Sequence, residues 1–100
     1  MSRTPSILQT DRHCWACGKL TELEEHHVFF GPKRQLSEKY GLKVYLCPEH
    51  HRYQPSGVHG GNRELDLRLK RFAQKRFEDR FGHELFMKVF GKNWISEEEE

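Results

Sequence analysis

Three cysteines and one histidine, arranged as two pairs of equal spacing, constrain this 100-residue chain more than any other feature. Two residues separate Cys14 from Cys17, and two residues separate Cys47 from His50. Two such pairs supply the thiolates and imidazole of a tetrahedral structural zinc site. A redox-active pair is the alternative, but no strand and helix of thioredoxin type surround it. We therefore predict structural Zn²⁺ held by Cys14, Cys17, Cys47 and His50, with His51 as the alternative fourth ligand.

The composition explains why such a chain needs a metal. Hydrophobic residues make up 35% and charged residues 32%, so a core of this size is small for a self-supporting domain. The odd number of cysteines does not fit a closed disulfide framework. We see no apolar run long enough to cross a membrane and no secretion signal near Met1. We therefore expect a soluble, cytoplasmic, single-domain protein.

The pattern of apolar residues predicts an α+β fold. Residues 20–30 and 42–47 read as two strands, and Pro48 suits the first position of a short helix. Asn62 is a candidate N-cap for an amphipathic helix that ends at Gly82, and a second helix follows at residues 84–90. The predicted order is a flexible leader (1–12), one domain (13–94) made of a zinc-bound core (13–61) and helices (62–94), and an acidic disordered tail (95–100).

The charge pattern favours an anionic partner. The formal charge of +2 includes four terminal glutamates, and basic residues are concentrated between Arg63 and Arg80. Such a segment suits DNA phosphates, although acidic residues within it also fit a plain solvated helix face. The side chains that we expect to contact DNA are Lys33, Arg34, Arg68, Arg71 and Lys75.

The histidines indicate a second site beside the zinc. Adjacent residues on a helix diverge by roughly 100°, so His51 should face away from a zinc-bound His50. On a strand, His26 and His27 normally point to opposite faces, but a bend at the strand end could bring both near one cleft. The spacing therefore leaves His51 aimed at the cleft beside His26 and His27.

These residues together carry a resemblance to a known family. The series Cys-x-x-Cys, His26-His27 and Cys-x-x-His-His51 resembles the zinc-stapled HNH endonucleases, which have the ββα-metal fold. Residues 24–92 resemble more narrowly the small phage and prophage HNH proteins that act as recombination-enhancement, recombinase-dependent nucleases. The most specific stretches are residues 37–51 and the loop that begins at Gly57. The resemblance implies DNA and a recombinase filament as partners, in the cytoplasm of a bacterial host.

The resemblance also implies hydrolysis of a phosphodiester bond with one catalytic metal ion. His27 stands where the family has its general base, which deprotonates the attacking water. His26 and His51 stand where the family has metal ligands, and His59 is the nearest substitute for a third ligand because Pro55 occupies that position. The implied catalytic ion is a divalent metal such as Mg²⁺, Mn²⁺, Ni²⁺ or Zn²⁺.

One further departure from the family concerns its middle asparagine, which orients the loop that holds the base. That position falls near Leu42, and no asparagine lies between His27 and Cys47. Backbone groups would then have to orient the base. The alternative function is a non-catalytic zinc-binding module that holds DNA or a protein. The histidines outside the zinc site favour the enzyme, because a structural module does not need them.

Overall fold

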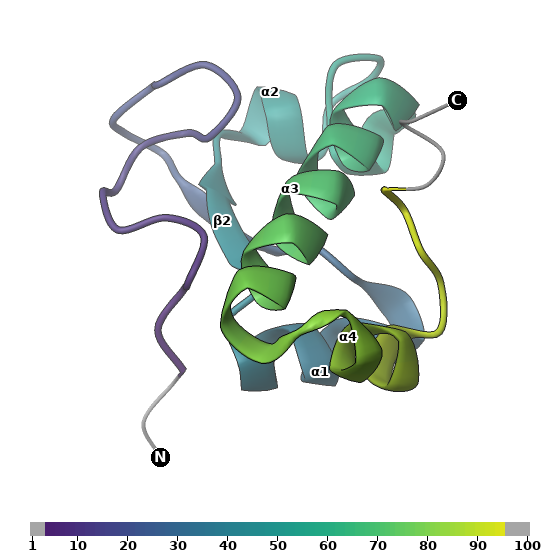
Figure 1. Ribbon diagram of the computed structural model, residues 1–100. Coiled ribbons are helices and arrows are strands. Elements are labelled where there is room, and N and C mark those ends of the chain that lie inside the picture. Colours follow the sequence, from purple (N-terminus) through teal and green to yellow (C-terminus); the bar gives the residue numbers. More distant parts are fainter. Residues whose placement is uncertain (1–3, 96–100) are drawn as a thin grey trace.

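The structure is a computed structural model that describes residues 4–95, and it confirms a small α+β domain. Within these residues, two antiparallel strands and four α-helices are joined by short 3₁₀ turns at Gly31–Lys33 and Val58–Gly60. Figure 1 shows α3 crossing the molecule, with α2 at one end and both α1 and α4 at the other. In the described part of the chain, no helix is long and apolar enough to cross a membrane. The elements are β1 (Glu24–His27), α1 (Arg34–Tyr40), β2 (Lys43–Leu46), α2 (Pro48–His51), α3 (Arg63–Phe81) and α4 (His83–Phe90).

The two strands are shorter than the sequence predicted. β1 pairs with β2 in a register that sets His26 opposite Val44 and His27 opposite Lys43. The expected strand over residues 20–30 covers only Glu24–His27, because a bend at residues 21–22, where Glu22 has a positive φ of 56°, precedes it and a second bend follows it. The alternation of β2 was read correctly, since Val44 and Leu46 are buried on one face.

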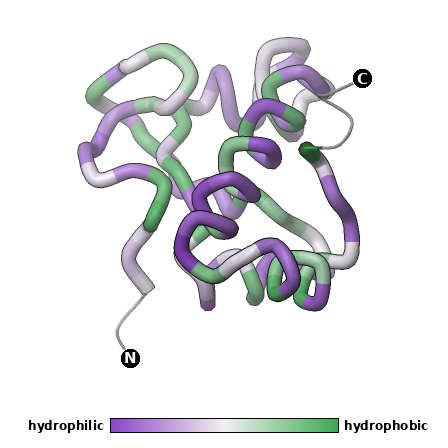
Figure 2. Tube along the Cα trace, in the orientation of Figure 1, coloured by the Kyte–Doolittle hydropathy of each residue, from purple (hydrophilic) through white to green (hydrophobic). Residues whose placement is uncertain are grey.

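The C-terminal helices follow their sequence signals closely. The Asn62 side chain accepts a hydrogen bond from the Leu65 amide at 3.0 Å, which confirms it as the N-cap of α3. Hydrophobic and hydrophilic residues follow one another along α3 in Figure 2, as expected for a helix buried on one side. An aromatic cluster packs α3 and α4 onto the segment after β1. Its rings belong to Phe29, Tyr40, Phe77, Phe86 and Phe90.

The N-terminal segment differs from the predicted loose leader. Among its described residues, Leu8 is buried in the core and the Ile7 amide donates to the Gly41 carbonyl at 2.9 Å. Ser6 Oγ donates to the Lys43 carbonyl at 2.6 Å, and Gln9 Oε1 accepts from the Tyr45 amide at 2.8 Å. The reason is that β2 pairs with β1 on one edge only, so its other edge needs hydrogen-bonding partners. The predicted tail at 95–100 lies outside the described residues except for its first member.

Candidate active site and metal centres

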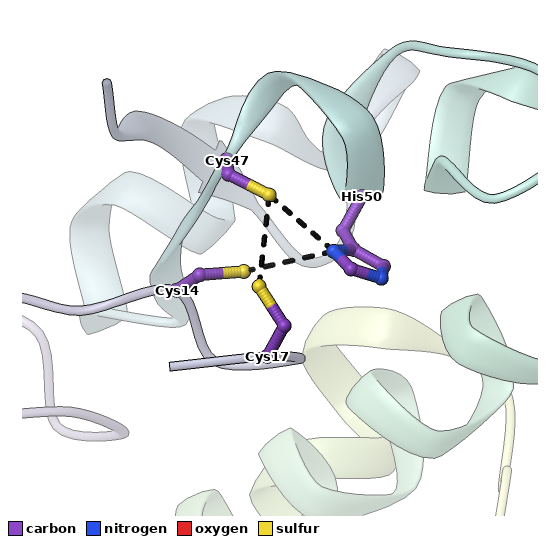
Figure 3. A group of neighbouring side chains, drawn as sticks. All are labelled: Cys14, Cys17, Cys47 and His50. Atoms are coloured by element: carbon purple, nitrogen blue, oxygen red, sulfur yellow. Dashed lines mark hydrogen bonds between the residues drawn. The ribbon is translucent and has the colours of Figure 1, made fainter. Parts of the chain in front are cut away.

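Four side chains converge where the segment before β1 meets the start of α2 (Figure 3). Cys17 Sγ lies 3.8 Å from Cys47 Sγ, and His50 Nδ1 lies 3.3 Å from Cys47 Sγ and 4.0 Å from Cys14 Sγ. Tetrahedral zinc with Zn–S bonds of about 2.3 Å requires its sulfur ligands to be about 3.8 Å apart. The four side chains are therefore placed to bind a metal ion such as zinc.

Local backbone hydrogen bonds position these four ligands. The Gly18 amide donates to the Cys14 carbonyl at 2.8 Å, and the Cys14 amide donates to the Lys19 carbonyl at 2.8 Å. Gly18 has a φ of 81°, which lets the chain reverse direction and turn both thiols inward. On the other side, the Cys47 carbonyl accepts from the His50 amide at 3.1 Å and fixes the first turn of α2. These two tight turns hold each pair of ligands at its two-residue spacing.

The pKa values of two of the three cysteine thiols are shifted by their surroundings. Burial raises the pKa of Cys14, but hydrogen bonds with the backbone at Cys47, Cys17 and Ala16 outweigh it and lower the pKa overall. A hydrogen bond with the Lys19 backbone lowers the pKa of Cys17, yet burial and the neighbouring thiols raise it overall. Deprotonating all three thiols would crowd negative charge, which a divalent ion relieves.

The structure separates the two adjacent histidines of α2. His50 faces the cysteines, whereas His51 faces His26 and His59. The three ring centroids of this second group, which we call the histidine triad, lie 5.0 to 5.3 Å apart. One ligand nitrogen from each ring lies within 4.8 Å of the other two. His50 is thus the histidine placed for zinc, and His51 is placed for the second site.

His26 carries a buried polar atom that no group in the described residues satisfies. Its Nε2 is inaccessible to solvent and has no hydrogen-bond partner. Burial, helped by the nearby His51 and His59, lowers the pKa of His26 to about 3, so the ring is neutral at physiological pH. Burial also lowers the pKa of His59. An unpartnered buried nitrogen is costly, and a metal ion is one partner that would satisfy it. The residues therefore fit a bound metal ion.

The Glu24 carboxylate contacts one histidine of the triad, His51. Glu24 Oε1 lies 2.8 Å from His51 Nδ1, and Arg52 holds the same carboxylate at 2.7 to 2.9 Å. The hydrogen bond from His51, followed by that from Arg52, lowers the pKa of Glu24, so the ionised carboxylate accepts the Nδ1 proton. His51 Nε2 is then left with its lone pair for a ligand. A carboxylate bonded to the far nitrogen is a common support for metal-binding histidines.

Two glycines bring His59 into the triad. His59 lies in the 3₁₀ turn Val58–Gly60, between Gly57 and Gly60. A Cβ on Gly57 would approach the Arg52 nitrogen to 2.7 Å, and one on Gly60 would collide with the Tyr53 backbone. Only glycine allows this turn to pack so closely on the end of α2. The turn thus supplies a third histidine where Pro55, at the expected helical position, has no donor atom.

A pocket of about 660 Å³ joins His27 to the triad. His27 lies on the opposite face of β1 from His26, yet both side chains border this pocket. His27 Nε2 lies 2.8 Å from Glu38 Oε1 on α1. The sequence reasoning missed Glu24 and Glu38. Glu24 had a detectable signal, because it precedes His26 by two residues and must share its face, whereas nothing in the sequence pointed to Glu38.

The predicted DNA-contacting bases are spread over several surfaces. Arg34 borders the histidine pocket, as does Arg52, which the sequence analysis did not single out. Lys33 donates to the Val89 carbonyl at 3.3 Å, and Arg71 donates to the Trp94 carbonyl at 3.2 Å. Arg68 lies over Trp15 beside the cysteine cluster, and Lys75 is exposed on α3. Only part of the predicted set therefore borders the pocket.

Comparisons of the chain with protein-family models, curated proteins and solved structures found no match. One cluster offers three sulfurs and one nitrogen, which suits a closed structural ion. The other offers three imidazoles beside a pocket of about 660 Å³.

The support that Glu24 gives to His51 leads to a prediction for metal binding. Replacing Glu24 by Gln should weaken Ni²⁺ binding to the zinc-loaded protein by roughly 10–100-fold, because His51 loses the carboxylate that fixes its ring. Calorimetric titration measures this affinity. Glu78→Gln is the matched control, since Glu78 pairs with the half-exposed His83 at 2.6 Å, also accepts from Gln74, and does not border the histidine pocket. Equal Ni²⁺ affinities for Glu24→Gln and Glu78→Gln would contradict the role of Glu24.

Proposed function

We propose that this protein is an HNH-type, metal-dependent DNA endonuclease with a ββα-metal core. One observation carries the proposal: His26 has a buried, unpartnered Nε2, and its ring lies against those of His51 and His59 beside a pocket that His27 also borders. The hairpin β1–β2 followed by α2 supports the same reading, because these elements hold three of these four histidines. A separate zinc ion, bound by Cys14, Cys17, Cys47 and His50, would hold the hairpin against α2.

In this proposal each histidine has a distinct task. His26, His51 and His59 hold the catalytic ion, and His27 takes the proton from the attacking water. When bound, the divalent ion would neutralise charge on the scissile phosphate and on the leaving 3′ oxygen. Arg34 at the pocket rim is positioned for a neighbouring phosphate. The products would be DNA strands ending in a 5′ phosphate and a 3′ hydroxyl.

The ligand set also bears on which metal the site prefers. Imidazole nitrogens suit Zn²⁺, Ni²⁺ and related transition metals, whereas Mg²⁺ prefers oxygen ligands. All three candidate ligands in the triad are imidazoles. Among the metals considered, we therefore favour Ni²⁺ or Zn²⁺ over Mg²⁺ and Mn²⁺, which both prefer oxygen ligands.

Cleavage of supercoiled plasmid tests the proposal. The zinc-loaded protein should convert supercoiled DNA to nicked or linear forms when Mn²⁺ or Ni²⁺ is added, and a chelator should stop the reaction. Single-stranded and double-stranded DNA should be assayed with and without a recombinase filament. Failure to cut either kind of DNA with any divalent metal, filament present or not, would favour the non-catalytic zinc-binding module.

DNA binding gives a separate prediction for Arg34. Replacing Arg34 by Gln should weaken binding at low salt and reduce the slope of log affinity against log salt by about 1, because one phosphate contact no longer releases a counterion. The control is Arg80→Gln, which removes the same charge beside Ile7 and Asp79, outside the histidine pocket. Fluorescence anisotropy at several salt concentrations measures both slopes. If Arg34→Gln leaves the slope of log affinity against log salt unchanged, Arg34 does not contact a DNA phosphate.

A further inference from the structure

The face of the β1–β2 hairpin that α1 covers holds a cluster of charged residues. None of them belongs to the Cys14, Cys17, Cys47 and His50 cluster or to the histidine triad. Glu25 and His27 are two residues apart on β1 and share this face, and Lys43 lies opposite His27 on β2. α1 places Glu38 over them. His27 Nε2 lies 2.8 Å from Glu38 Oε1, and Lys43 Nζ lies 3.0 Å from each Glu38 oxygen and 3.6 Å from Glu25 Oε2.

The position of Glu38 is fixed by a clamp between α1 and the end of β1. The buried hydroxyl of Ser37 donates to the Phe29 carbonyl at 2.8 Å and accepts from the Phe29 amide at 3.0 Å. α1 ends at Gly41, whose φ of 72° turns the chain back into β2. Glu38, the next residue after Ser37, is therefore held against the strand that carries His27.

The charges of this cluster determine which nitrogen of His27 carries a proton. Hydrogen bonds from His27 and then Lys43 lower the pKa of Glu38 to about 2, so its carboxylate is ionised at neutral pH. An ionised carboxylate only accepts hydrogen bonds, so Nε2 of His27 must be the donor. In the neutral ring, Nδ1 is then the nitrogen with the free lone pair.

We propose that Glu38 is the positioning residue of the general base, holding the His27 ring in one orientation and in the tautomer that accepts a proton at Nδ1. This inference rests on the proposed function and deepens it. Glu38 would act through His27 and would contact neither DNA nor the catalytic metal. Carboxylates that orient a catalytic histidine in this way are known from hydrolases of unrelated fold.

The same three groups, Glu25, His27 and Glu38, also lie close enough together to suggest a metal site. Lys43 argues against a metal there. Its side chain is only 5% exposed, and its ammonium group already lies against both carboxylates. A divalent cation would have to displace this buried charge, so the cluster is better explained as a support for His27.

The test compares Glu38→Gln with variants of matched chemistry. At saturating metal, Glu38→Gln should slow single-turnover DNA cleavage roughly 10–100-fold, while Ni²⁺ affinity and zinc content stay unchanged. Glu24→Gln should show the opposite pattern, with weaker Ni²⁺ binding that high metal restores. Glu78→Gln, which alters a Glu–His pair outside the pocket, should cut at the wild-type rate.

A second readout does not depend on cleavage. Nitrogen NMR of the zinc-loaded wild type should show His27 as the Nε2–H tautomer, and Glu38→Gln should show a mixture of tautomers.

A double variant controls for misfolding. Glu38→Gln leaves the buried charge of Lys43 without its main partner, and Glu38→Gln/Lys43→Met removes that charge as well. The double variant should be as slow as Glu38→Gln, whereas Lys43→Met alone should stay close to wild type.

Several results would overturn the inference. If wild type cuts DNA and folded Glu38→Gln or its double variant cuts equally well, the role of Glu38 fails while the proposed function stands. If Lys43→Met alone slows cleavage as much as Glu38→Gln, the cluster serves only to hold the fold. If wild type cuts no DNA under any condition, the proposed function fails and this inference fails with it.

Discussion

Replacing Cys14 by Ala is expected to unfold the domain. Cys14 is fully buried and is one of the three cysteines in the cluster that could bind zinc. Structural zinc contributes an apparent binding free energy of about 10–16 kcal/mol, which is comparable to the total stability of about 5–15 kcal/mol that a typical domain has. Circular dichroism and native mass spectrometry would show loss of secondary structure and of bound zinc.

Wild type stripped by a chelator is the control for this prediction. It should lose structure in the same way, and adding zinc back should restore the wild type but not Cys14→Ala. A Cys14→Ala protein that stays folded and binds one zinc ion per chain would contradict the assignment of the cluster.

Replacing His27 by Ala is expected to produce the largest loss of activity without loss of the fold. Cleavage should fall by roughly 10²–10⁴-fold, which is the usual contribution of a positioned general base. Zinc content and Ni²⁺ affinity should persist, because His27 belongs to neither metal cluster in this account. The measurement is single-turnover cleavage at saturating metal, with His83→Ala as the control because His83 is exposed on α4.

The triad variants should behave differently from His27→Ala. His26→Ala and His51→Ala should weaken the catalytic metal, so part of their activity should return at high metal concentration. His59→Ala tests the ligand that comes from the 3₁₀ turn. If His59→Ala binds the catalytic metal as tightly as the wild type does, His59 is not a ligand and the Val58–Gly60 turn has only a structural role. Cleavage by His27→Ala at the wild-type rate would remove His27 from the mechanism.

The elements and the zinc cluster were largely predictable because their signals are local. The spacing of Cys14, Cys17, Cys47 and His50 needs only two tight turns, and each turn is set by neighbouring residues. The N-cap at Asn62 and the end of α3 at Gly82 are likewise short-range features. The divergence of adjacent helical residues was enough to send His50 and His51 to different sites.

The parts that sequence reasoning missed depend on contacts between distant residues. The segment around Ser6 and Gln9 lacks a periodic pattern, and it packs because the open edge of β2 needs hydrogen-bonding partners. Glu38 reaches His27 and Lys43 only because α1 folds back over the hairpin. From the sequence we expected backbone groups to orient His27, and we now propose that the Glu38 side chain does so.

Anomalous X-ray scattering would show whether one chain holds two metal ions at two different sites. Crystals of the zinc-loaded protein, soaked in Ni²⁺, would be measured at the absorption edges of both metals. We expect a zinc peak among Cys14, Cys17, Cys47 and His50 and a nickel peak among His26, His51 and His59. A second ion bound at Glu25, His27 and Glu38 instead, or no ion at the triad at millimolar Ni²⁺, would contradict this expectation.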